Sequence, residues 1–200
     1  MLDGSTVQIG AALNRLVAGD PAARDELLAR TTDRLGRLAS RTLRVGFPRV
    51  SAFEQTDDVV QSVMLRLLKG WDGVVAGEGG VTLDPAEYLC RVSRLLREVL
   101  LDLARKHFGS AARRPTVPLA DDDVGSDTLN PAALAAYTDF HTAVETLPDH
   151  LRRVVDLHWY QELTHTEVSG FLGIGESTSR KYWVEARVIL ARKLGSNPFL

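Results

Sequence analysis

The sequence predicts an all-α protein made of two small helical domains joined by a flexible, acidic linker. Apolar residues recur at spacings of three and four along most of the chain, and convincing runs of alternating β-branched residues are absent. Residues 109–130 have no such period and are rich in Pro, Asp, Gly and Ser. The length of 200 residues suits one or two small domains.

Four helices are expected in the first domain, residues 1–108. They lie at about residues 7–19, 21–45, 55–69 and 85–108. Asp20-Pro21 and Asp84-Pro85 each combine a helix-capping side chain with a proline at the first helical position. A Gly-rich loop is expected between the third and fourth helices.

The second domain, residues 131–200, is predicted to contain a helix-turn-helix. Asn130-Pro131 and Leu147-Pro148 each begin a helix, and Thr164-His165-Thr166-Glu167 has the form of a capping box. Gly173 supplies the tight turn, and a last helix runs from about Glu176 to Leu194.

The second helix of such a motif lies in the DNA major groove, and its first residues reach base edges. In this chain the outward residues of that helix are Glu176, Ser177, Arg180, Lys181 and Arg187. The alternative is an ordinary helical hairpin with a solvated basic face.

Composition excludes several other classes of protein. An apolar content of 44% is ordinary for a globular protein, and the single cysteine, Cys90, allows no intramolecular disulfide. No apolar run approaches the length of a membrane span, and we expect no secretory signal. We therefore expect a cytoplasmic protein.

Charge is strongly segregated, although the net charge is only −2. Segment 91–114 carries seven basic and two acidic side chains, whereas segment 115–150 carries seven acidic side chains and no Lys or Arg. Five arginines also recur at spacings of three and four in the second helix: Arg30, Arg34, Arg37, Arg41 and Arg44. A basic helix face is the electrostatic pattern that a phosphate backbone attracts, although a single stripe is more often just solvated.

Three segments, in this order, resemble the extracytoplasmic-function (ECF) group of bacterial sigma factors. Residues 55–67, QTDDVVQSVMLRL, are similar to the acidic, glutamine-containing helix of sigma factors. Residues 88–105 resemble the promoter-melting helix of the ECF group, and residues 147–178 resemble the group's second conserved domain. Together the matches cover nearly the whole chain.

The resemblance implies that core RNA polymerase and promoter DNA are the partners, with an anti-sigma factor as a further possible partner. It assigns polymerase binding to Asp57, Asp58, Val59, Gln61, Val63 and Met64. It assigns the downstream (minus-10) element to Tyr88, Arg91, Arg94, Arg97, Arg105 and Lys106. It assigns the upstream (minus-35) element to Glu176, Ser177, Arg180 and Lys181. Tyr88 or Trp71 would stack on an unpaired base, although packing against the third helix is the favoured interpretation for Trp71. The acidic linker would thread the basic channels of the polymerase.

Two residues depart from the family pattern. Gly175 replaces the usual serine at the cap of the last helix, a change worth a few tenths of a kcal/mol. Ser179 replaces a usually buried valine, and its hydroxyl needs a partner such as a carbonyl one turn back. Ser179 therefore puts the pose of that helix in question.

Three other functions remain as alternatives. A regulator with a helix-turn-helix would need a ligand pocket or dimer helix in its first domain. A degenerate sigma-like protein would act by protein contacts alone. An enzyme could begin a metal site with His158, Glu162 and His165, but the usual paired-His motif is absent, so we expect no catalytic site, metal or cofactor.

Overall fold

The computed structural model describes residues 4–46, 56–69, 84–108 and 131–195, and the regular structure within these ranges is entirely helical. The predicted all-α class is therefore confirmed. The predicted linker, 109–130, and Trp71 lie outside the described residues.

The N-terminal half contains α1 (Gly4–Val17), α2 (Ala22–Gly46), α4 (Thr56–Lys69) and α6 (Pro85–Phe108). Helix α2 packs against α1 and α4, and α4 packs against α6. Both Asp-Pro starts act as expected, because Oδ1 of Asp20 accepts a hydrogen bond from the Ala22 amide and Oδ1 of Asp84 accepts one from the Ala86 amide.

The C-terminal half contains α7 (Pro131–Glu145), α8 (Asp149–Val155), the π-helical turn η2 (Asp156–Tyr160), α9 (His165–Leu172) and α10 (Glu176–Leu194). One apolar cluster lies entirely within this half. It includes Phe140, Val144, Leu151, Ala186 and Leu190, so α7, α8 and α10 share a core.

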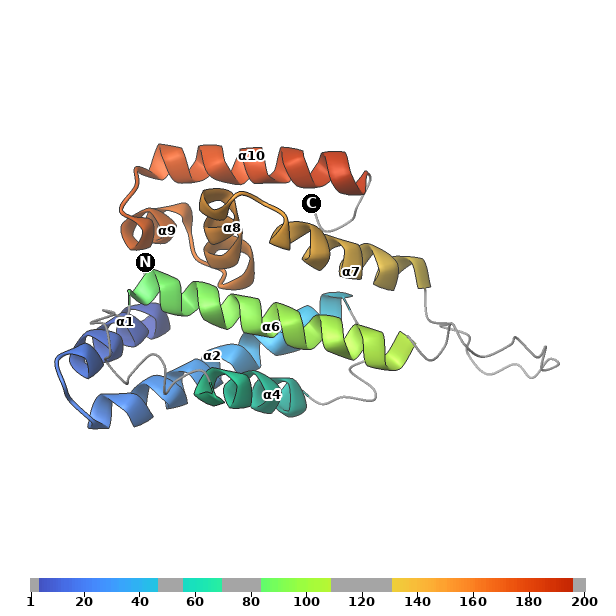
Figure 1. Cartoon of the computed structure of the whole chain (residues 1–200). Coiled ribbons are helices and arrows are strands. Elements are labelled where there is room, and N and C mark those ends of the chain that lie inside the picture. The colour runs from blue at the N-terminus through green and yellow to red at the C-terminus, as the bar shows by residue number, and fades with distance from the viewer. Residues whose placement is uncertain (1–3, 47–55, 70–83, 109–130, 196–200) are drawn as a thin grey trace.

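The two halves also pack on each other. Figure 1 shows α6 between the other N-terminal helices and the C-terminal helices, and α6 contacts η2, α7 and α9. A second apolar cluster joins buried side chains of both halves, for example Leu96 and Val99 of α6 with Leu157 and Leu163. The arrangement in which the two halves pack together, called the closed arrangement below, therefore has an apolar core of its own.

Where the halves meet, α8 continues into η2. The Gln161 amide donates to the Asp156 carbonyl at 3.2 Å, five residues back, which widens the last helical turn. Glu162 follows with a φ of 55°, a left-handed conformation that costs a non-glycine residue about 1–2 kcal/mol. The widened turn directs Asp156, Tyr160 and Gln161 inward, where all three are buried.

No helix in the described part of the chain has both the length and the apolar content needed to cross a membrane.

Candidate functional site

Helices α9 and α10 form the predicted helix-turn-helix. The Thr164 hydroxyl accepts from the Glu167 amide, and the Glu167 carboxylate accepts from the Thr164 amide at 2.7 Å, so the capping box is present. Gly173 ends α9 at φ 63°, ψ 30°, the left-handed conformation that glycine adopts without strain. Gly175 begins α10 with no side-chain cap.

The predicted base-reading residues lie at the start of α10. Ser177, Arg180 and Lys181 are exposed, and Glu176 is partly exposed. The Glu176 carboxylate accepts from Nε of Arg180 at 3.2 Å and from Oγ1 of Thr166 at 2.8 Å. The bond from Arg180, and then the bond from Thr166, lower the pKa of Glu176, which keeps this carboxylate ionised.

Ser179 is fully buried, and its hydroxyl has a side-chain partner. Oγ of Ser179 lies 3.0 Å from Nδ1 of His165, the first residue of α9. The expected partner was a carbonyl of the same helix. Nothing in the sequence near Ser179 indicates a contact with a histidine fourteen positions earlier. The buried hydroxyl of Ser179 therefore has the partner that its burial requires.

His165 is also stacked on His158. The two ring centroids are 4.2 Å apart with an angle of 22° between the planes, and the His158 ring meets Trp183 edge-on at 4.8 Å. Partial burial, and then His158, lower the pKa of His165. Glu162 pairs with Arg41 rather than with either histidine. Among the described residues, no three His, Cys, Asp or Glu side chains are grouped to hold a metal ion.

Helix α4 presents an acidic face with a leucine on it. Asp57, Asp58 and Gln61 are exposed, and Leu65, one turn after Gln61, is 52% exposed. The residue list from the sequence needs correction here, since Val59 and Val63 are buried in the core and Met64 packs partly against it. A helix that buries one side between α2 and α6 cannot offer those valines to a partner. Leu65 was not among the contacts predicted for this helix.

Helix α6 exposes only some of the residues that were predicted to contact DNA. Arg94, Arg105 and Lys106 are exposed and Arg91 is partly exposed. Arg91, Arg94 and Arg105 share one side of the helix, because separations of 3 and 11 residues are close to whole turns. Arg105 also pairs with Asp102 at 2.9 Å.

Tyr88 requires a second correction, because it is 1% exposed and cannot stack on a base. Its hydroxyl lies 2.7 Å from Oγ1 of Thr31 on α2, and burial raises the pKa of Tyr88 to about 12. Both residues belong to the N-terminal half, so this contact does not depend on the C-terminal half.

A comparison with known families places this chain in one of them. The family model described as ECF sigma factor matches residues 6–196. The chain belongs to the ECF sigma factor family. This family acts in transcription initiation with RNA polymerase and promoter DNA, and its members are regulators rather than enzymes. A comparison with curated proteins gave no match.

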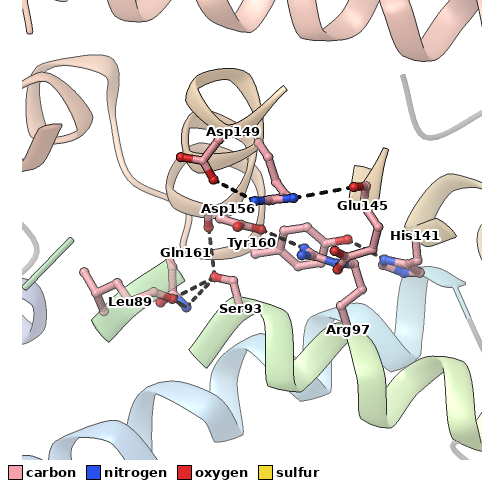
Figure 2. A network of polar contacts seen from close by, with 10 residues as sticks. Leu89, Ser93, Arg97, His141, Glu145, Asp149, Asp156, Tyr160 and Gln161 are labelled. Carbon is pink, nitrogen blue, oxygen red and sulfur yellow. Dashed lines mark hydrogen bonds and ion pairs between the residues drawn. The ribbon is translucent and has the colours of Figure 1, made fainter. Parts of the chain in front are cut away.

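In this ECF sigma factor, the predicted DNA contact Arg97 is buried where the two halves meet. Its side chain has no exposed surface, because the C-terminal half covers it (Figure 2). Nη1 donates to Asp156 at 2.7 Å, Nε donates to Glu145 at 2.6 Å, and the guanidinium lies 4.8 Å from the centre of the Tyr160 ring. The sequence shows Arg97 as one more basic residue of α6, with nothing to mark it as a buried ion pair.

Burial and the neighbouring charges have opposite effects on the pKa values of Arg97 and Asp156. Burial works to lower the pKa of Arg97, but Tyr160, Asp156 and Glu145 outweigh it and the pKa is raised. Burial raises the pKa of Asp156 despite the guanidinium. Both groups are ionised. Arginine does not lose its proton in proteins, and its positive charge, 2.7 Å away, stabilises the ionised form of Asp156. The pair therefore ties α6 to η2.

Further polar contacts surround this ion pair. Ser93 of α6 donates to the Asp156 carbonyl at 3.0 Å and accepts from the Gln161 amide group at 2.9 Å. Nε of Arg34 on α2 donates to Oε1 of Gln161 at 2.7 Å, and Arg41 pairs with Glu162. Two arginines of the α2 stripe thus bind the turn after η2.

Proposed function

We propose that this ECF sigma factor binds core RNA polymerase and directs promoter-specific transcription initiation. The observation that carries the proposal is the helix-turn-helix, in which a capped α9 supports an α10 whose first turns expose Ser177, Arg180 and Lys181. That arrangement suits reading base edges in a major groove. The family membership supplies the setting of transcription initiation.

In this proposal each exposed face has its own partner. The face of α4 with Asp57, Asp58, Gln61 and Leu65 binds core polymerase, since acidic side chains around an exposed leucine complement a basic surface with an apolar recess. The basic side of α6, with Arg91, Arg94 and Arg105, holds DNA at the downstream element. The first turns of α10 read the upstream element.

We also propose that residues 1–108 and 131–200 act as two domains, with residues 109–130 as the connector. Beside the shared apolar cluster, the contact between the halves includes polar side chains such as Arg34, Ser93 and Gln161, as in interfaces between domains that can separate. Arg97 can reach DNA only after Asp156 and Glu145 leave it. The closed arrangement is therefore a resting state that polymerase binding would open.

A run-off transcription assay with core polymerase and a promoter library tests the proposal directly. The wild-type protein is expected to select promoters that share an upstream and a downstream element. A protein that binds DNA alone but gives no transcript with core polymerase would instead be a helix-turn-helix regulator. A protein that binds core polymerase but selects no promoter would be a sigma-like protein that acts by protein contacts.

Variants of α4 test the polymerase-binding face. Changing Asp58 and Gln61 together to Ala should reduce co-purification with core polymerase, and changing Leu65 to Ser should reduce it further. The control pair is Asp25 and Asp33, two exposed acids of α2, also changed to Ala. Equal binding by the α4 variants and the control would refute this assignment.

A further inference from the structure

Two side-chain contacts join the first turn of α9 to the first turn of α10. Nδ1 of His165 meets Oγ of Ser179 at 3.0 Å, and Oγ1 of Thr166 donates to Oε2 of Glu176 at 2.8 Å. The two helices of the motif are therefore held together by hydrogen bonds at the end that is proposed to face DNA, and not by apolar packing alone.

The contact between His165 and Ser179 lies inside the motif. Ser179 is fully buried on the inner side of α10, the side that also holds Ala186 and Leu190. A hydroxyl buried without a partner loses its hydrogen bonds to water, which is unfavourable. The position of α10 in which Ser179 meets His165 is thus preferred over neighbouring positions in which the hydroxyl has no partner.

His165 cannot easily move away from Ser179, because its ring is held on the other side. It stacks on His158 with ring centroids 4.2 Å apart, and Nδ1 of His158 lies 2.6 Å from the Leu163 carbonyl oxygen. Since a carbonyl only accepts, Nδ1 of His158 carries the proton and fixes that ring. The His158 ring in turn contacts Trp183 of α10 edge-on.

The residues next to this contact are the ones proposed to read DNA. Arg180 directly follows Ser179, and it pairs with Glu176, which Thr166 also holds. A small rotation of α10 about its inner contacts would therefore move the guanidinium of Arg180 and the amine of Lys181 relative to the bases. Hydrogen bonds to base edges depend strongly on such distances and angles.

We propose that His165 and Ser179 are positioning residues for promoter recognition. Their hydrogen bond sets the orientation of α10 on α9, and through it the upstream bases that Arg180 and Lys181 prefer. The inference rests on the proposed function, because α10 must read DNA for its orientation to matter. Neither residue touches DNA itself.

Three variants separate positioning from simple stability. His165→Phe keeps a flat ring for the stack but leaves the Ser179 hydroxyl without its partner. His165→Asn places an amide nitrogen or oxygen close to where Nδ1 was. The double variant His165→Phe with Ser179→Val removes both polar groups, which can restore stability without restoring the hydrogen bond.

The experiment uses the full-length protein with core polymerase and a promoter library randomised in the upstream element. The first step is selection by the wild-type protein, and a failure there overturns the proposed function itself. In the second step each variant selects from the same library, and its thermal unfolding is measured separately. Ser169→Ala is the matched control, because that hydroxyl donates only to the Thr166 carbonyl of its own helix.

His165→Phe is expected to change the preference at one or more upstream base pairs by about tenfold, the effect of losing one good base contact. His165→Asn and Ser169→Ala should keep the wild-type preference. The double variant should regain thermal stability yet keep the altered preference. A wild-type preference in the double variant, or no rescue by His165→Asn, would overturn the positioning role while leaving the proposed function in place.

Discussion

Arg97 is charged, fully enclosed and bound by acids that come from another part of the chain. Asp156 of η2 and Glu145 of α7 both lie within hydrogen-bonding distance of its guanidinium. Removing the two charges from water costs free energy that is similar in size to the attraction between them. The pair therefore adds little to the stability of the fold compared with apolar packing. Removing Asp156 is different, because the buried guanidinium then keeps only the partly exposed Glu145 of these two acids.

Asp156→Asn is therefore expected to lower the free energy of unfolding by about 3 kcal/mol, as breaking a buried ion pair does. Asparagine keeps the size of the side chain, loses its charge and replaces one acceptor oxygen with a donor amide group. Urea denaturation followed by circular dichroism measures the change. Asp149→Asn is the control, because Asp149 pairs with Arg152 while 70% exposed, and its loss should cost less than about 1 kcal/mol. Equal losses in both variants would mean that the Arg97 pair is not the special one.

His141 predicts how stability depends on pH. Burial, and then the charge of Arg97, lower the pKa of His141 well below 6.5, so the folded protein keeps this imidazole neutral. The unfolded chain takes up the proton near its ordinary pKa of about 6.5. Stability is therefore lost as the pH falls below about 6.5, by roughly 1.4 kcal/mol from this group at pH 5.5.

Measuring the free energy of unfolding at pH 7.5 and 5.5 tests this effect. His141→Asn is expected to be less stable at pH 7.5 because it disturbs the contact with Tyr160, and to lose less stability on acidification than the wild type. A steep pH dependence in the His141 variant would assign the effect to other groups, of which His165 is the first candidate.

At the residue scale, the sequence identified the types of functional side chains better than their accessibility. Arg94, Arg180 and Asp58 are exposed as expected, whereas Tyr88, Arg97 and Val63 are buried. The helical period shows which residues share a side. It does not show that α6 has neighbours on two sides, one of which comes from a segment about sixty residues later.

At the element scale, the helix starts and ends were largely predictable because the signals are local. Asp20, Asp84 and Thr164 cap helices as their sequence contexts indicated, and Gly173 adopts the expected left-handed conformation. The π-helical turn was missed. The extra residue in this turn places Asp156 and Gln161 in contact with Arg97 and Ser93, which lie far away in the sequence. Nothing in the local sequence indicates these contacts.

The start of α10 offers a prediction about capping. Gly175→Ser should stabilise the protein by a few tenths of a kcal/mol, because serine supplies the cap that glycine lacks. Gly175 has φ −69°, and an added Cβ would meet its nearest neighbour at 3.6 Å, an ordinary contact. Thermal unfolding gives the measurement. Gly173→Ser, at φ 63°, should instead destabilise by about 1 kcal/mol, and the prediction fails if the two changes have the same sign.

At the scale of the whole molecule, the closed arrangement and the proposed function make different demands on α6. In the closed form the C-terminal half covers Arg97 and leaves Arg94 and Arg105 exposed. Separating the halves exposes the apolar contacts they share and breaks the Arg97 pair. A partner can supply this free energy only by binding the open form more tightly than the closed form.

Core polymerase is the partner expected to do so, and energy transfer between two dyes can show it. Cysteines replacing Glu87 on α6 and Glu185 on α10 would carry the dyes, since both positions are exposed and lie in different halves. Cys90 can remain, because burial, and then the charge of Asp156, raise the pKa of its thiol to about 12 and make it slow to react. Adding core polymerase should lower the transfer efficiency.

A second pair, at Asp139 and Glu185 within the C-terminal half, should show no change. Unchanged transfer between 87 and 185 in a protein that demonstrably binds polymerase would mean that the halves stay together, and that Arg97 has no role on DNA.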